Sequence, residues 1–151
     1  MGIKIGDKAP DFSLPDQTGK MVRLKDFQGK KSVVLYFYPK DDTPGCTKES
    51  CTFRDHYEVF KEAGAEVIGI SSDSTDSHQQ FASKYRLPFL LLSDEGGKIR
   101  KLYGVGSTLG VLPGRVTYII DKNGIIRHIF SSQFSPMKHV DEAMEFLKTA
   151  S

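Results

Sequence analysis

The two cysteines of the chain, Cys46 and Cys51, are the residues best suited to chemistry. They lie five positions apart in the segment PKDDTPGCTKESC, residues 39–51. Thr43 followed by Pro44 is typical of a helix start, with Thr43 as the N-cap and Pro44 as the first helical residue. Cys46 then falls in the first helical turn, where unpaired N–H groups and the positive end of the helix dipole favour a thiolate. The segment therefore predicts a nucleophilic cysteine at position 46.

Other interpretations of the cysteines are open. Cys46 could be a small buried hydrophobic residue, as many free cysteines are, and Cys51 could be a bystander. A zinc site would need four convergent ligands, and the other soft candidates, the histidines at 56, 78, 128 and 139, are scattered along the chain. Five residues turn a helix by about 140°, so the two thiols leave on different faces. A helix start just beyond a central strand favours the reactive cysteine, because α/β folds place their ligands there.

The elements that must position this segment alternate between strand-like and helix-like periodicity. Strands are expected at residues 12–14, 21–24, 32–38, 66–71, 89–92, 116–121 and 125–130. Helices are expected at residues 44–63, with Gly64 as the C-terminal cap, at 76–85, at 97–103, and from 135 onward. The first two strands and the last two flank turn sequences and are expected to form hairpins. This order resembles that of a thioredoxin-like fold: a single α/β domain over residues 1–151, with a central mixed sheet, helices on both faces and an N-terminal β-hairpin.

Composition excludes several classes of protein. The chain has 151 residues and a net charge of +2, with no block of basic residues, so charge gives no reason to expect nucleic-acid binding. The longest apolar run, residues 33–38, is far shorter than the roughly 20 residues of a membrane span. Two cysteines do not make a disulfide scaffold of the secreted kind. We expect a globular protein without a membrane segment, from which a transit peptide could have been removed.

The segment also carries a family resemblance. Pro39, Thr43 and Cys46 have the spacing P-x-x-x-T-x-x-C of the peroxiredoxins. The longer string YPKDDTPGCTKE, with a second cysteine five residues on, resembles the bacterioferritin comigratory protein, or Q-type, subfamily. The stretches GDKAPDFSLPDQTGK, YRLPFLLLSDEGGK and LPGRVTYIIDKNG and the closing helix are similar to that subfamily as well, so the resemblance covers nearly the whole chain.

The resemblance implies roles for individual residues. Cys46 would be the peroxidatic cysteine and Cys51 the resolving cysteine of an atypical 2-Cys thiol peroxidase. Thr43 would offer its hydroxyl to the peroxide, and Pro39 would shield the thiolate. Arg115, in the string LPGR, would match the active-site arginine of the family.

Reduction of a peroxide by a cysteine requires residues of these types. A thiolate attacks one peroxide oxygen, and negative charge moves to the leaving oxygen. Donors fixed around that oxygen stabilise the transition state: Arg115, the Thr43 hydroxyl, and the N–H groups of Gly45 and Cys46. Glu49 is a candidate for orienting the arginine. The remaining polar residues are given no chemistry, and Asp41 and Asp42 are expected to cap the loop or face solvent, because an acid beside a thiolate would oppose its ionisation.

The resemblance further implies substrates and partners. It implies reduction of hydrogen peroxide and organic hydroperoxides without metal or cofactor, re-reduction by thioredoxin or a similar protein, and a monomer active in antioxidant defence. The location would be bacterial cytoplasm, or plastid stroma after removal of a transit peptide. A general thiol–disulfide oxidoreductase and a non-enzymatic redox sensor are the alternatives. The missing C-x-x-C motif weighs against the first, and Thr43 with Arg115 weighs against the second.

Overall fold

The computed structural model describes residues 3–108, 112–133 and 135–149. Its centre is a five-stranded sheet with the order β5-β4-β3-β8-β9. The strands are β3 (Ser32–Phe37), β4 (Ala65–Ser71), β5 (Leu90–Ser93), β8 (Val116–Ile120) and β9 (Ile126–Ser131). β3 pairs parallel with β4 and antiparallel with β8, so the sheet is mixed and β3 is central, as predicted.

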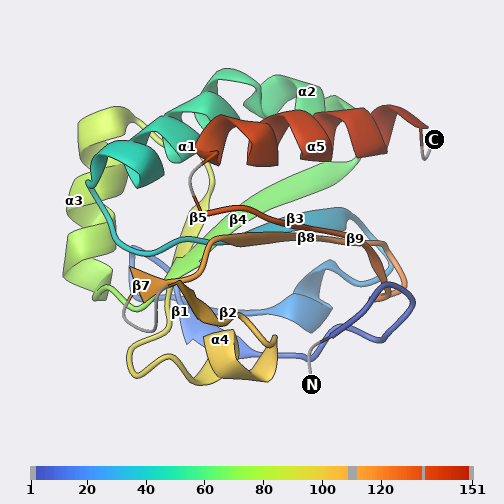
Figure 1. The fold of residues 1–151 in the computed structure, drawn as a ribbon, viewed down its shortest axis with the longest axis horizontal. Coiled ribbons are helices and arrows are strands. Elements are labelled where there is room, and N and C mark those ends of the chain that lie inside the picture. Colours follow the sequence, from blue (N-terminus) through green and yellow to red (C-terminus); the bar gives the residue numbers. More distant parts are fainter. Residues whose placement is uncertain (1–2, 109–111, 134, 150–151) are drawn as a thin grey trace.

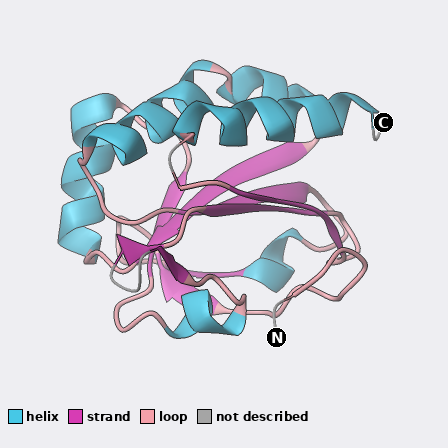
Figure 2. Cartoon of the chain, viewed as in Figure 1, coloured by secondary structure: helices cyan, strands magenta, loops and turns pink. Residues whose placement is uncertain are grey.

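Helices lie on both faces of this sheet, as predicted, but unequally (Figures 1 and 2). One face carries the four longer helices: α1 (Pro44–Asp55), α2 (Tyr57–Glu62), α3 (Thr75–Tyr85) and α5 (Pro136–Thr149). The other face carries the predicted N-terminal hairpin of β1 (Ser13–Pro15) and β2 (Met21–Arg23), the 3-10 helix η1 (Leu24–Phe27) and α4 (Lys98–Leu102). No helix in the described part of the chain is long and apolar enough to cross a membrane.

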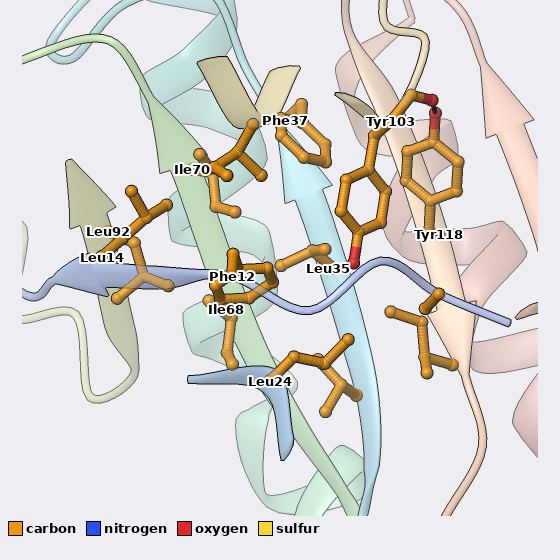
Figure 3. Close-up of a cluster of buried hydrophobic side chains, with 14 of the residues drawn as sticks. Phe12, Leu14, Leu24, Leu35, Phe37, Ile68, Ile70, Leu92, Tyr103 and Tyr118 are labelled. Atoms are coloured by element: carbon orange, nitrogen blue, oxygen red, sulfur yellow. Dashed lines mark hydrogen bonds between the residues drawn. The ribbon is translucent and has the colours of Figure 1, made fainter. Parts of the chain in front are cut away.

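The central strand is buried on both faces, which explains its unbroken apolar sequence. Leu35 and Phe37 point into the core beneath the hairpin, together with Ile68 from β4 and Phe12 and Leu24 from the N-terminal segment (Figure 3). The alternate residues of β3 point into the second core, beneath the helices; they are Val34 and Tyr36, and Tyr38 follows just after the strand. The carboxyl end of β3 is therefore held firmly where the chain turns into α1.

Tyr36 fixes α1 on the sheet. Its ring stacks on Phe53 of α1 with centroids 4.6 Å apart, and its hydroxyl lies 2.8 Å from the Ser50 hydroxyl. Gly69 in β4 leaves the space for this ring, because a Cβ there would lie 2.8 Å from Tyr36 Cζ. The core-facing stripe of α1 predicted from the sequence is thus confirmed, with Cys46, Ser50 and Phe53 all buried.

Two features differ from the sequence prediction. The helix expected over residues 44–63 is divided into α1 and α2 at His56, whose φ and ψ are −110° and 11°. The apolar periodicity continues through this step without a proline or glycine, so the pattern alone does not reveal it. Beyond the step, the Tyr57 hydroxyl donates to Glu66 in β4 at 2.6 Å, and Gly64 ends the segment with φ +77°. The second feature is a small antiparallel pair, β6 (Ser107–Thr108) with β7 (Leu112–Pro113), which is too short to leave a periodic signal.

Candidate active site

Cys46 lies in the first turn of α1, as the sequence predicts. Thr43 has the extended backbone of an N-cap, with φ −97° and ψ 155°, and Pro44 opens the helix. The Thr43 hydroxyl does not cap the helix; it donates to the Lys40 carbonyl at 2.9 Å. Cys46 is 1% exposed, so its side chain is almost completely buried. Both Cys46 and Cys51 are free thiols.

Arg115 meets the Cys46 sulfur. It follows β7, and its Nη2 donates to Cys46 Sγ at 3.4 Å across a separation of 69 positions. Its Nη1 donates to Glu49 Oε1 at 2.6 Å, and its Nε donates to the Gln133 carbonyl at 3.2 Å. Burial works against its charge, but Glu49 and Cys46 together raise the pKa of Arg115, which stays a cation. A rigid, permanently charged donor therefore touches the sulfur.

Glu49 is completely buried beside this arginine. Burial raises the pKa of Glu49 to about 8, against the opposing pull of Arg115. Its Oε2 has no hydrogen-bond partner among the described residues and lies 3.7 Å from His139 Nδ1. Burial also lowers the pKa of His139 to about 4, and its ring bridges the Thr117 hydroxyl and the Ser132 carbonyl at 2.8 Å each. The neutral ring of His139 thus helps to shield the carboxyl group of Glu49 from solvent.

Gly45 permits the close approach of the arginine to the helix. A Cβ at this position would lie 3.1 Å from Arg115 Nη2, closer than side chains normally tolerate. The residue before Cys46 therefore combines a free backbone N–H, expected from its place in the first turn, with space for the guanidinium. The sequence predicts only the role of its N–H group. The steric role becomes visible only once the fold brings Arg115 against Gly45.

Arg100 is a second buried arginine at the site, and sequence reasoning missed it. Its Nη2 donates to the Tyr38 carbonyl at 3.0 Å, and its Nη1 donates to the Gly114 carbonyl at 3.3 Å. Tyr38 directly precedes Pro39, and Gly114 directly precedes Arg115. Arg100 therefore ties together the two loops that carry the site. Its place in a short surface-like helix, among the charges of KIRKL, hides this role in the sequence.

The remaining predicted residues take different places. Pro39 is half-buried in the loop that leads into α1. Cys51 is also half-buried, on α1 but away from the core-facing stripe of Cys46, and burial raises the pKa of its thiol. Asp42 faces solvent, one of the two expected arrangements, whereas exposure to solvent is wrong for Asp41: its carboxylate is buried and hydrogen-bonded to α3. The side chain can be buried there because its charge is met by a histidine and hydroxyl donors.

This geometry favours one kind of chemistry. Cys46 sits at a helix start with unpaired N–H groups, and a cation touches its sulfur. Such an arrangement favours a thiolate and provides donors for negative charge that develops beside it. The site can therefore attack an electrophile whose leaving atom becomes an anion. No carboxylate forms a hydrogen bond to the sulfur among the described residues.

Comparisons with known proteins agree with this chemistry. Residues 5–129 match the model of the AhpC/TSA family. "Peroxiredoxin Q, chloroplastic" from Arabidopsis thaliana is 62% identical over 149 residues, covering 98% of this chain and 68% of the relative. The protein of the same name from Sedum lineare is 58% identical over 145 residues, covering 95% of this chain and 77% of the relative.

Solved structures are similar over their whole length. "Peroxidoxin BcpB" from Mycobacterium tuberculosis matches with a TM-score of 0.91 at 41% identity, covering 99% of both chains. A peroxiredoxin Q from Xanthomonas campestris matches with a TM-score of 0.87 at 28% identity, covering 97% of this chain and 96% of the other.

Proposed function

Because the chain belongs to the AhpC/TSA family, as a thiol peroxidase of the peroxiredoxin Q or bacterioferritin comigratory type, we propose that Cys46 reduces hydrogen peroxide and organic hydroperoxides. The observation that carries this proposal is the contact of 3.4 Å between Arg115 Nη2 and the Cys46 sulfur at the start of α1. Thiol–disulfide exchange releases a thiolate and no oxyanion, so a donor fixed where a leaving oxygen would develop its charge favours peroxide as the substrate.

In the first step the Cys46 thiolate attacks one oxygen of the peroxide. The O–O bond breaks, the sulfur becomes a sulfenic acid, and the second oxygen leaves as hydroxide or alkoxide, which takes a proton from water. Arg115 and the N–H groups of Gly45 and Cys46 stabilise the charge on that oxygen. The Thr43 oxygen, whose own proton is engaged with the Lys40 carbonyl, accepts the peroxide O–H. Each donor is in place before substrate arrives, which is what makes it effective.

Two further residues support this step. Glu49 holds Arg115 through the 2.6 Å hydrogen bond and so directs its other nitrogen at the sulfur. Pro39, half-buried next to the buried Tyr38, shields the thiolate from water. A shielded thiolate reacts with a small peroxide more readily than with bulky thiols or oxidants.

Cys51 then resolves the sulfenic acid by forming a disulfide with Cys46 and releasing water. Both cysteines lie on α1, and in a regular helix their Cα atoms are about 8.6 Å apart. A disulfide requires roughly 4.4–6.8 Å and converging side chains. The first turns of α1 must therefore unwind, at the loss of several helical hydrogen bonds. The segment is suited to this because it contains several weaker helix formers than alanine: Gly45, Thr47, Ser50 and Thr52.

Hydrogen exchange on the intact chain tests this route. Reduced protein is compared with protein treated with one equivalent of hydrogen peroxide, after mass spectrometry has established the Cys46–Cys51 bond. The hydrogen-bonded amides of this segment, residues 47–54, should exchange slowly in the reduced form and rapidly in the oxidised form, because the oxidised segment is unwound. The amides of β4, which is paired on both sides inside the sheet, serve as an internal control that should not change. Equal protection of residues 47–54 in both forms, with the bond present, would contradict the unwinding.

The reductant and location complete the proposal. A disulfide between Cys46 and the half-buried Cys51 is within reach of a dithiol protein once α1 unwinds, and we assign re-reduction to thioredoxin or a thioredoxin-like protein. The chain works as a monomer, without nucleic acid or membrane, in antioxidant defence. The chloroplastic names of its plant relatives support the plastid stroma, and the bacterial structures support bacterial cytoplasm.

A further inference from the structure

The loop of residues 39–43, which carries the chain from β3 into α1, is anchored through the buried side chain of Asp41. Asp41 Oδ1 accepts from the Tyr38 hydroxyl, and Oδ2 accepts from the Ser77 hydroxyl at 2.8 Å. Oδ2 also lies 2.6 Å from Nδ1 of His78, a residue of α3 that is completely buried. Side chains of α3, which lies beside this loop (Figure 1), therefore bind the loop at Asp41, two residues before the N-cap Thr43.

The two ring nitrogens of His78 both face acceptors. Nε2 lies 2.9 Å from the Leu92 carbonyl oxygen, which can only accept, so Nε2 carries a proton. Nδ1 lies 2.6 Å from the Asp41 carboxylate, and a hydrogen bond there also requires a proton between the two atoms. Either His78 is an imidazolium or Asp41 is protonated. In both arrangements the pair holds one more proton than a neutral histidine beside an ionised aspartate.

The other groups around His78 do not remove this requirement. The Tyr38 hydroxyl, 3.5 Å from Nδ1, donates to Asp41. Asp73, from the turn after β4, accepts through Oδ2 from the Asp41 backbone N–H at 2.8 Å and from the Ser71 hydroxyl at 2.6 Å. Asp41, Asp73 and His78 could in principle hold a metal ion, since their ligand atoms lie within 4.8 Å of one another. Their hydrogen bonds to one another and to neighbouring hydroxyls already satisfy them, so the cluster is a hydrogen-bonded network.

The loop needs such an anchor because its backbone is strained. Asp42 has φ +56°, in the left-handed region that residues other than glycine seldom adopt. α3 also holds the Asp42 side chain, through Lys84 at 2.8 Å and the Tyr85 hydroxyl at 2.7 Å. These two contacts are exposed to solvent, whereas the Asp41–His78 contact is buried and is the firmer of the two anchors.

We propose that His78 is a positioning residue of the peroxidase: the proton it shares with Asp41 holds the loop of residues 39–43, and with it the helix start that presents Thr43 and Cys46 to peroxide. When that proton is lost, the Nδ1 lone pair faces the carboxylate, the contact becomes repulsive, and the loop is released. The effect on rate rests on the proposed peroxidase function; the shared proton does not.

Nitrogen-15 NMR of the histidine-labelled, reduced wild-type protein tests the shared proton without any activity measurement. At neutral pH, His78 should show a proton on or shared at Nδ1 in addition to the one on Nε2. His128, which is partly exposed and lies on β9, is the internal reference, because its ring does not contact Asp41. A His78 spectrum of the neutral tautomer with a proton on Nε2 alone, together with an ionised Asp41, would overturn the proposal.

Variant kinetics test the positioning role. His78→Leu removes the donor, and should lower the second-order rate constant with hydrogen peroxide on the order of 10- to 100-fold, the effect of a displaced catalytic group. His78→Asn keeps an N–H near Nδ1 that cannot titrate, so it should recover most of the rate. His128→Asn should match the wild type throughout.

Two outcomes separate failure of this proposal from failure of the proposed function. A His78→Leu variant that folds and keeps the wild-type rate would overturn the positioning role. Should this variant not fold, NMR of the wild type still decides, because a neutral His78 with its proton on Nε2 alone beside an ionised Asp41 would contradict the shared proton. If the wild type itself consumed no peroxide, the peroxidase function would fail. NMR of the wild type, and the amide protection of residues 41–43 in His78→Leu compared with His78→Asn, would still decide whether the pair holds the loop.

Discussion

Replacing Cys46 by serine should abolish peroxide consumption. A serine hydroxyl in the same place is not ionised near neutral pH and cannot supply the nucleophile, whatever donors surround the peroxide. The side chain is buried and similar in size, so the fold and the Arg115–Glu49 pair should persist. Peroxide loss is followed by stopped-flow or by a peroxide electrode, with near-ultraviolet circular dichroism to check the fold.

Cys51→Ser is the matched control for this variant. It should consume one equivalent of peroxide at the wild-type rate and then stop with thioredoxin as reductant, because Cys46 is left as a sulfenic acid. That acid should over-oxidise more readily than in the wild type, since no thiol captures it. A Cys46→Ser protein that keeps more than a small fraction of the rate would show that Cys46 is not the peroxidatic residue.

The second large effect is expected at Arg115. Arg115→Ala removes the cation that lies 3.4 Å from the sulfur and one of the donors to the leaving oxygen. Loss of one such donor costs on the order of 10²–10³ in rate at comparable sites. The Cys46 thiolate also loses its positively charged neighbour, which adds to the loss of rate. Burial already raises the pKa of Glu49 to about 8; without Arg115 this carboxyl should stay protonated, which limits the cost of leaving it buried.

Two further variants sharpen this test. Arg115→Lys keeps a positive charge but cannot reach the sulfur and Glu49 in the same planar geometry, so it should recover only part of the rate. Arg127→Ala removes an exposed arginine that is paired loosely with Asp121 at 3.7 Å, and should behave as wild type. The second-order rate constants with hydrogen peroxide are measured for the three variants and the wild type. A near-normal rate in Arg115→Ala would refute the assigned role.

The sequence predicts well what depends on local signals. Thr43 and Pro44 mark the helix start, and so place Cys46 in its first turn. The apolar run of β3 predicts a central strand buried on both faces. Both signals are short-range, because capping and burial act on neighbouring residues. The break at His56 has no such signal, since the apolar stripe passes through it without interruption.

The rest of the site depends on contacts between distant segments. Arg115 is 69 positions from Cys46, and its place was expected only from the family resemblance. Arg100, His139 and the pair of Asp41 with His78 lie in segments whose patterns suggest ordinary surface or core residues. Asp41 in particular looks like a solvated loop residue beside Asp42, and only the packing of α3 against the loop reveals that it is buried. The contacts of these residues form only when distant segments pack together, so no local sequence pattern predicts them.

The most direct test of the central claim is a single turnover of the reduced wild-type chain with one equivalent of hydrogen peroxide. Samples are quenched at increasing times with a sulfenic-acid reagent and an alkylating agent, and peptides are analysed by mass spectrometry. The account predicts that one oxygen appears first on the Cys46 peptide, and that this species then decays into a disulfide joining Cys46 to Cys51. Oxygen appearing first on Cys51, or no reaction of Cys46 with peroxide, would contradict the account.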